Sequence, residues 1–288
     1  MQQRSAFDPE HRYDVRTWDM ECRRVGEDAL GALIYQPSGP GPFPMLLDVH
    51  GGAWHSGSRT QNALLDGELA AAGMVVMALD FRRAPQHPYP AQVVDVHYAT
   101  RWLKAHASEL NGDPDTLGGL GTSSGGHTVL LSAMRPSDPR YGAFPLEEGP
   151  DVDSTLKYVL ALWPVLDPYA RYFFALETGR EALAASGDDY FLSKAAMQEG
   201  NPQMLLERGE QEDLPAVLII QPTPDGNIPR SMPERFVEAY RAAGGSIELE
   251  WFEGARHGFA RKPSPETDRA LGLMKAFVGR QLAALGTA

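Results

Sequence analysis

The sequence lacks several features, and each absence excludes a class of protein. Cys22 is the only cysteine in 288 residues, so the chain can form neither an internal disulfide nor a cysteine-rich metal site. The longest apolar stretches, GMVVMAL and YVLALWPVL, are under half of the ~20 residues that a membrane-spanning helix needs. The N-terminal segment MQQRSAFDPE has no apolar region typical of a signal peptide. We therefore expect a cytoplasmic protein.

Positive charge is also scarce. The chain has 26 basic and 38 acidic residues, which give a formal net charge of −12. Its arginine pairs at 23–24 and 82–83 stand apart from each other, so no basic patch is available for nucleic acid or for an anionic membrane surface. We expect a small molecule as the partner, with no nucleic acid and no membrane. The sequence leaves the oligomeric state open, a homodimer included.

Short apolar and β-branched runs recur along the chain, and such runs predict strands. The candidate strands are 14–22, 29–37, 44–50, 73–81, 115–123, 157–164, 216–223 and 246–254. Stretches with helical spacing of apolar residues lie between or after the later strands, at 91–106, 233–245 and 268–285. This order predicts one α/β domain over residues 1–288, with a mostly parallel eight-stranded sheet flanked by helices and an antiparallel hairpin at its N-terminal edge.

One connection is much longer than the others. It runs over residues 167–213, between two apolar strands, and is rich in Tyr, Phe, Leu and Met. Connections of this length usually have a function, and we expect a small cap over a pocket. Tyr169 and Phe173 from this cap, with Trp54, are candidate contacts for a modest apolar or aromatic substrate. Simple packing of the cap on the domain would also account for these aromatic residues.

The segment GLGTSSGGHTVLL carries the pattern G-x-S-x-G at residues 121–125. It follows a candidate strand and begins an apolar helix, which is the setting of a nucleophile elbow. Small neighbours allow Ser123 to occupy a tight turn between strand and helix, and the helix N-terminus favours negative charge there. We predict that Ser123 is a nucleophile. A glycine-rich turn without chemistry also fits the pattern when it is taken alone.

A serine nucleophile needs a base, and an acid that orients the base, in the chain order Ser, Asp or Glu, His. His257 follows the last candidate strand, and Asp225 lies in a Pro-Asp-Gly turn after the preceding strand. Both positions fall at the edge of the sheet where parallel α/β folds bind ligands. We predict that Ser123, Asp225 and His257 are catalytic. Asp167 is the rival acid, and no spacing of His and Cys indicates a metal site.

The segment DVHGGAWHSG at residues 48–57 has adjacent glycines directly after a candidate strand. Attack by a serine on an acyl carbon creates an oxyanion, which needs backbone N–H donors already directed toward it. Glycine lets the backbone turn its amides in this way and keeps side chains away from the substrate oxygen. We predict an oxyanion hole built from Gly51, Gly52, Ala53 and the N–H of Ser124.

These motifs resemble the α/β-hydrolase superfamily and, within it, the hormone-sensitive-lipase-like and feruloyl-esterase-like bacterial serine esterases. The resemblance covers residues 25–285 and rests on HGGAW at 50–54, DFRRAPQHPYPAQVVDV at 80–96, GTSSGGH at 121–127, Asp225 and His257. It implies an α/β-hydrolase fold and hydrolysis of short-chain or small aromatic carboxylic esters through an acyl-enzyme intermediate, without a cofactor. It also implies a structural role for residues 80–96.

Two departures from the family pattern leave alternatives open. The loop reads HGGAW in place of HGGG, and Ser124 stands where alanine is usual. Arylformamidases share the HGGxW pattern, so hydrolysis of an N-formyl amide is one alternative. A binding protein on the same fold is another, although such chains typically lack the serine or the histidine.

Overall fold

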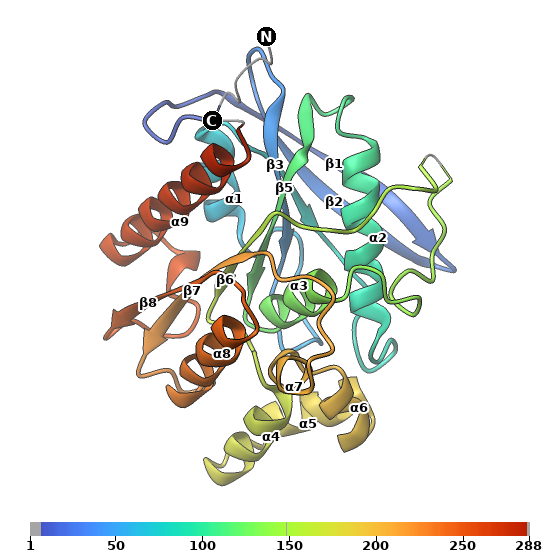
Figure 1. Ribbon diagram of the computed structural model, residues 1–288, viewed down its shortest axis with the longest axis vertical. Helices are drawn as coiled ribbons and strands as arrows, with labels where there is room; N and C mark the ends of the chain where they lie inside the picture. Colours follow the sequence, from blue (N-terminus) through green and yellow to red (C-terminus); the bar gives the residue numbers. More distant parts are fainter. Residues whose placement is uncertain (1–6, 148, 287–288) are drawn as a thin grey trace.

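An eight-stranded sheet runs through the molecule, with helices on both of its faces (Figure 1). The computed structural model describes residues 7–147 and 149–286, so the expected domain limits at 1 and 288 lie outside the described part, as does the beginning of the N-terminal segment. The strands are β1 (Val15–Val25), β2 (Asp28–Pro37), β3 (Phe43–Val49), β4 (Val75–Leu79), β5 (Gly112–Thr122), β6 (Tyr158–Leu162), β7 (Ala216–Thr223) and β8 (Ile247–Glu253). Each predicted strand overlaps one of them.

The strand order is β1-β2-β4-β3-β5-β6-β7-β8. Strand β2 pairs antiparallel with both β1 and β4, whereas the pairs from β4 to β8 are all parallel. The prediction of a mostly parallel sheet with an N-terminal antiparallel hairpin is therefore confirmed. Because the parallel strands all run in one direction, the loops that follow β3, β5, β7 and β8 meet at one edge of the sheet.

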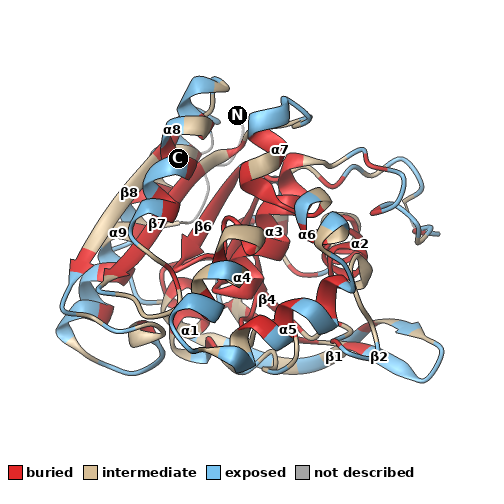
Figure 2. Ribbon diagram, turned by 90° about the horizontal axis from the view of Figure 1, so that it is seen from below, coloured by how far each residue is buried: buried red, intermediate tan, exposed pale blue. Residues whose placement is uncertain are grey.

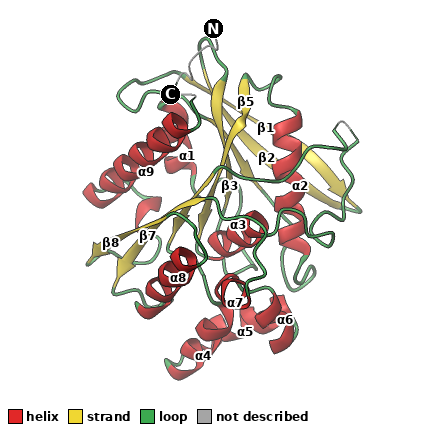
Figure 3. Ribbon diagram, viewed as in Figure 1, coloured by secondary structure: helices red, strands yellow, loops and turns green. Residues whose placement is uncertain are grey.

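Helices cover both faces of the sheet, and a further group lies beyond the ends of its strands (Figure 3). They are α1 (Ala63–Ala71), α2 (Ala91–Ala105), α3 (Ser124–Met134), α4 (Pro168–Glu177), α5 (Glu181–Phe191), α6 (Lys194–Glu199), α7 (Pro202–Arg208), α8 (Ser231–Ala242), α9 (Pro265–Ala284) and the short 3₁₀ helix η1 (Phe259–Arg261). Side chains of α2, α3 and α8 belong to the apolar core on one face, and those of α1 and α9 to the core on the other. None of the helices in the described ranges has the length and apolarity needed to cross a membrane.

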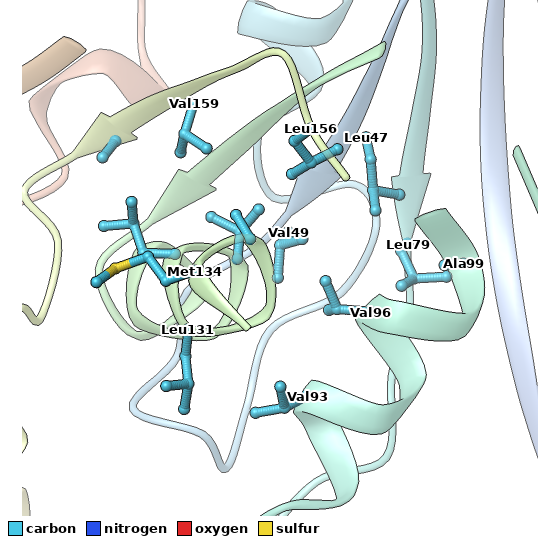
Figure 4. Close-up of a cluster of buried hydrophobic side chains, with 14 of the residues drawn as sticks. Leu47, Val49, Leu79, Val93, Val96, Ala99, Leu131, Met134, Leu156 and Val159 are labelled. Atoms are coloured by element: carbon cyan, nitrogen blue, oxygen red, sulfur yellow. The ribbon is translucent and has the colours of Figure 1, made fainter. Parts of the chain in front are cut away.

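Helix α3 is held firmly against the middle of the sheet. In Figure 4, Leu131 and Met134 of α3 lie in one cluster with Val49 of β3, Val159 of β6 and Val96 of α2. All of these side chains are fully buried, since helices cover both faces of a parallel sheet and its strands are apolar on both sides. This packing fixes the N-terminus of α3, where Ser123 lies.

Helices α4 to α7 form the long insertion between β6 and β7, and they lie together beyond the carboxyl ends of the strands (Figure 1). Seen from that end, α4 and α5 each expose an outer face, whereas the residues of their inner faces are buried (Figure 2). Tyr89 connects the insertion to the body, because its hydroxyl lies 2.7 Å from the Tyr141 hydroxyl and donates to Glu199 of α6 at 2.5 Å. Arg135 and Arg140 of the body donate to the other oxygen of Glu199 at 3.1 and 2.7 Å.

Candidate active site

Ser123 occupies the turn between β5 and α3 in a strained conformation. Its φ is 54° and its ψ is −117°, a region that residues with a side chain rarely adopt. The flanking glycines are required by space: a Cβ on Gly125 would lie 2.0 Å from the carbonyl oxygen of Val49, and one on Gly121 would lie 2.6 Å from Val129. The turn therefore raises the serine side chain above the end of the sheet, as the sequence predicts.

The structure brings the three predicted catalytic side chains into one hydrogen-bonded chain. His257 Nε2 lies 3.0 Å from Ser123 Oγ, and His257 Nδ1 lies 2.8 Å from Asp225 Oδ2. Asp225 is almost completely buried, and its Oδ1 accepts from the backbone N–H of Asn227 at 2.7 Å. The side chain of Gln221 donates to Oδ2 at 3.0 Å, a contact that the sequence did not predict. These donors stabilise a carboxylate that faces the imidazole.

Asp167, the rival acid, has a structural position instead. It caps the N-terminus of α4, where its Oδ1 accepts from the N–H of Ala170 at 2.9 Å and from the side chain of Asn201 at 2.8 Å. Its Oδ2 lies 3.6 Å from Arg235. A carboxylate that caps a helix in this way is committed to backbone donors, and the structure shows no hydrogen bond between Asp167 and His257.

Three backbone N–H groups remain free near Ser123. Those of Gly52, Ala53 and Ser124 have no hydrogen-bond partner within residues 7–147 and 149–286. Gly52 has a φ of 126°, and a Cβ there would lie 2.0 Å from the carbonyl oxygen of Ser56, so only glycine fits this turn. These three groups have the type and setting needed to receive developing negative charge.

Gly51 differs from the prediction. Its N–H donates to the side-chain oxygen of Gln61 at 2.8 Å and is therefore not available to an oxyanion. The prediction that the Gly51 N–H is an oxyanion donor is therefore wrong. The absence of a side chain at Gly51 instead leaves room for the neighbouring backbone. A Cβ at Gly51 would lie 2.8 Å from the carbonyl oxygen of Thr122 and 3.1 Å from Ser123 Cβ.

Side chains on both sides hold the loop after β3 in place. The His50 ring stacks on Phe81 with centroids 4.2 Å apart, and burial lowers the pKa of His50 to about 4. The backbone N–H of Trp54 donates to Ser124 Oγ at 3.2 Å. This contact gives the unusual serine at position 124 a purpose, since alanine could not tie the loop to the start of α3.

The segment 80–96 supports the same loop. Asp95 is buried and accepts from both the backbone and the guanidinium of Arg82, the latter at 2.7 Å from Nη2. The carbonyl of Trp54 accepts from the Ala84 N–H at 3.1 Å and from the Gln92 side chain at 2.6 Å. These contacts agree with the structural role that the family resemblance implies for this segment.

The predicted substrate-binding residues occupy different environments. Trp54 is only 2% exposed, stacks on Tyr190 of α5 at 5.1 Å, and donates from Nε1 to Nδ1 of His127 at 3.2 Å. Tyr169 and Phe173 pack on each other on α4 with centroids 5.0 Å apart, and Phe173 is 41% exposed. Trp54 therefore joins the loop after β3 to the insertion, whereas no ring contact or hydrogen bond links Tyr169 or Phe173 to Ser123 or His257 in the described structure.

Arg171 of α4 is a neighbour of the site that the sequence did not single out. Its side chain is buried, and its Cζ lies 5.5 Å from the centroid of the Trp54 ring. One arginine on a short amphipathic helix is typical of a solvated face, so the sequence carried no signal of this burial.

A metal ion has no set of ligands at this site. Among the described residues, no three His, Cys, Asp or Glu side chains lie close enough together to bind one. A cavity of about 400 Å³ opens beside the end of the loop after β3, at Gly57, Ser58 and Phe81, but the hydrogen-bonded chain of Ser123 does not line it. The chemistry that this arrangement supports is nucleophilic attack by a serine.

Several known proteins and one family model are similar to this chain. The BD-FAE family model matches residues 33–239. Esterase LipC of Mycobacterium tuberculosis is 32% identical over 230 residues, which are 76% of this chain and 53% of LipC. The carboxylic ester hydrolase LipN of the same organism is 30% identical over 245 residues, which are 79% of this chain and 60% of LipN. The chain thus spans little more than half the length of these relatives.

Solved structures extend the likeness over nearly the whole chain. Esterase 2 of Thermogutta terrifontis, in its form phosphoramylated by tabun, has a TM-score of 0.75 and 27% identity, and the match covers 94% of this chain and 95% of that one. EstE1, a carboxylesterase cloned from a metagenomic library, shares the fold with a TM-score of 0.76 at 23% identity, over 94% of this chain and 90% of EstE1. With most of its length matched by the family model and its sheet matched by these esterases, the chain belongs to the BD-FAE family and has the α/β-hydrolase fold.

Proposed function

We propose that this protein is a serine carboxylesterase with Ser123 as nucleophile, His257 as general base and Asp225 as the acid that orients the base. The observation that carries this proposal is the continuous hydrogen-bonded chain, with 3.0 Å between Ser123 Oγ and His257 Nε2 and 2.8 Å between His257 Nδ1 and Asp225 Oδ2. The family membership and the esterase names of the relatives support it.

In the first half of the reaction, Ser123 Oγ attacks the ester carbonyl carbon and its proton moves to His257 Nε2. Asp225 accepts from Nδ1–H, holds the ring in the productive tautomer and stabilises the imidazolium. The free N–H groups of Gly52, Ala53 and Ser124 would receive the negative charge on the carbonyl oxygen. The tetrahedral intermediate then collapses, the bond to the alcohol oxygen breaks, and His257 gives its proton to that oxygen.

In the second half, water takes the place of the alcohol. His257 removes a proton from the water as it attacks the acyl carbon, and the same N–H groups stabilise the second oxyanion. Collapse breaks the bond to Ser123 Oγ, which recovers a proton from His257, and the carboxylic acid leaves. Every proton transfer runs through His257, and the two steps balance without a cofactor.

Ester hydrolysis is favoured over the two alternatives. The relatives reported above are named as esterases or ester hydrolases, which favours an ester over an N-formyl amide as the substrate. A binding protein on this fold would have no need for the intact hydrogen-bonded chain or for the strained φ of 54° at Ser123.

The segment 167–213 serves in this proposal as a cap that limits the substrate to short or small aromatic acyl groups. Trp54 stacks on Tyr190 of the cap with ring centroids 5.1 Å apart, and Phe191 packs edge-on against both rings, with its centroid 4.7 Å from that of Tyr190. Structures of Thermogutta terrifontis esterase 2 have been solved with propionate and with butyrate bound. Tyr169 and Phe173 remain candidate contacts at the outer rim of the cap.

Ser123→Ala should remove activity without unfolding the protein, because it deletes only the nucleophilic oxygen. We expect kcat for 4-nitrophenyl butyrate to fall by about 10⁶-fold. Wild type should also be labelled covalently by a fluorophosphonate, and the variant should not be. Ser132→Ala is the matched control: this serine lies on the same helix α3 outside the hydrogen-bonded chain of Ser123, so the variant should still be labelled. Near wild-type turnover by Ser123→Ala would sink the proposal.

Asp225→Asn should lower kcat by about 10⁴-fold, because the amide stabilises the wrong histidine tautomer and cannot stabilise the imidazolium. Asp167→Asn provides the comparison. Asparagine caps a helix about as well as aspartate, so this variant should keep its fold and stay within a few-fold of wild-type kcat. The reverse result, with Asp167→Asn as the crippling change, would identify Asp167 as the acid.

The pH profile should have an acid limb, since only neutral imidazole can accept the serine proton. As the pH is lowered from the alkaline side, kcat/KM should fall toward a slope of about tenfold per pH unit, because the general base must be neutral to act. Burial lowers the pKa of both His50 and His127 to about 4, so these rings stay neutral down to about pH 5 and do not produce the limb. A profile that stays flat down to pH 5 would count against His257 as the base.

The preference for acyl length should reflect the filled space under the cap. We expect kcat/KM for 4-nitrophenyl esters to be highest between acetyl and hexanoyl and to be lower by about 10-fold or more for palmitoyl. The measurement is a series of initial rates below the solubility limit of each ester. Values that keep rising toward palmitoyl would show that the cap leaves room for a long chain.

A further inference from the structure

Arg171 carries a buried positive charge that has no counter-charge in hydrogen-bond contact. Its side chain is 3% exposed, its Nε has no hydrogen-bond partner, and its Nη atoms form no hydrogen bond or ion pair within the described residues. Burial lowers the pKa of its guanidinium to about 10, so the group is still charged at neutral pH. An unpaired buried charge is costly, and a protein that keeps one usually has a use for it.

Three neighbours locate this charge at the active site. The Trp54 ring, 5.5 Å from Arg171 Cζ, belongs to the loop that carries the free N–H groups. Asp225 raises the pKa of Arg171 through its charge, and Arg171 in turn helps to lower the pKa of His127 on α3. The guanidinium therefore lies against the loop that carries the free N–H groups, and close enough to Asp225 and His127 for charge interactions with both.

Structural arginines in this protein are paired, which sets Arg171 apart. Arg101 is also buried, and although its Nε has no hydrogen-bond partner either, its Nη2 donates to the carbonyl oxygen of Phe144. Arg82 has bidentate contact with the buried carboxylate of Asp95. If Arg171 served only to pack the cap, its donors would be expected to find such acceptors too. Contact with the face of Trp54 satisfies none of them.

Unpaired arginines are concentrated around the active site. Within the described structure, the arginine side chains that form neither a hydrogen bond nor an ion pair are those of residues 16, 171, 180, 256 and 261. Arg180 packs on the Asp225 loop, where a Cβ on Gly226 would lie 2.3 Å from its Nη2. Arg261 Nη2 lies 3.4 Å from the corresponding position on Gly51, and Arg256 directly precedes His257.

This distribution contrasts with the charge of the whole chain. The formal net charge is −12, so a diffuse field would repel an anionic substrate. At the site, however, the buried guanidinium of Arg171 is accompanied by the half-buried side chain of Arg180 and the exposed side chains of Arg256 and Arg261. A buried charge is screened less by solvent and salt than charges on the distant surface, so Arg171 contributes more to the local field.

Building on the proposed esterase activity, we propose that the site prefers esters that carry a carboxylate beside the scissile ester, and that Arg171 is the residue that binds this carboxylate. The planar guanidinium matches a carboxylate with two parallel hydrogen bonds, which would satisfy the donors of Arg171 that no protein group accepts. The carboxylate can belong to the acyl part, as in a half-ester of a short dicarboxylic acid, or to the alcohol part. The experiment separates these sources.

Two matched pairs of substrates report the effect of the carboxylate. Monoethyl glutarate and ethyl pentanoate differ by a charge at the end of the acyl chain, whereas 4-acetoxybenzoate and 4-acetoxybenzamide differ by a charge on the alcohol side. We expect wild type to have a kcat/KM ratio of charged to neutral ester of at least one in one of the pairs. Arg171→Met should lower that ratio by about 10- to 100-fold, the value of charge-assisted hydrogen bonds.

Two further variants provide the controls. Arg16→Met removes the charge of an unpaired arginine on the exposed edge strand β1, and it should leave the ratio unchanged. Arg171→Lys keeps the charge but loses the planar fork, so its ratio should lie between those of wild type and Arg171→Met. If Arg171→Met does not fold, the lysine variant and the wild-type ratios still decide the question.

The outcomes separate this inference from the proposed function. If wild type hydrolyses neither neutral ester, the esterase proposal itself fails. If it hydrolyses the neutral esters but has a kcat/KM ratio of charged to neutral ester below one in both pairs, the carboxylate preference is overturned and the esterase proposal stands. A wild-type preference that neither Arg171 variant changes would assign the carboxylate to another residue and overturn the role of Arg171.

Discussion

The left-handed turn at Ser123 is the constraint on which the rest of the site depends. A φ of 54° is costly for serine, and it persists because β5 enters the turn and α3 leaves it under tight packing. The glycines at 121 and 125 remove the atoms that would block the approach of β3 and α3. The backbone of Ser123 is also tied into β6 and the loop after it, with its N–H donating to Leu162 and its carbonyl accepting from Val165, both at 3.0 Å. The core under α3 therefore determines where Ser123, the proposed nucleophile, lies.

The loop after β3, whose N–H groups are the proposed oxyanion donors, contacts the same helix. The insertion of helices α4 to α7 packs in turn on that loop. Ser124 Oγ accepts from the Trp54 N–H, and the Trp54 ring in turn stacks on Tyr190 of α5. His127, one turn further along α3, accepts from Trp54 Nε1, and its Nε2–H donates to the carbonyl oxygen of Gly200 in the insertion at 2.8 Å. Trp54 and His127 thus connect the start of α3 and the loop after β3 to the insertion of helices α4 to α7.

The sequence predicted the parts of this protein that local patterns encode. Strand runs, the α2, α8 and α9 periods and the elbow glycines are local, and each predicted strand overlaps an observed one. Helix α1 was missed because its apolar residues do not gather on one side, so it shows no amphipathic period. The sequence did not predict three other features: the hydrogen bond between Gly51 and Gln61, the hydrogen bond between Gln221 and Asp225, and the burial of Arg171. These residues come into contact only when the sheet and the insertion pack together, and no local sequence pattern predicts such contacts.

Charge shows most clearly how composition and site differ. A net charge of −12 describes the average surface, where ion pairs such as Arg280 with Glu248 are exposed and contribute little to stability. The charge at Arg171 acts in a buried setting, where water does not screen it and each unmet donor matters. Burial of an unpaired guanidinium is energetically unfavourable. A substrate that accepts hydrogen bonds from it would offset this free energy, so the proposed selectivity follows from the same burial. The composition of the chain thus describes its average surface, whereas the proposed ester selectivity depends on one buried side chain.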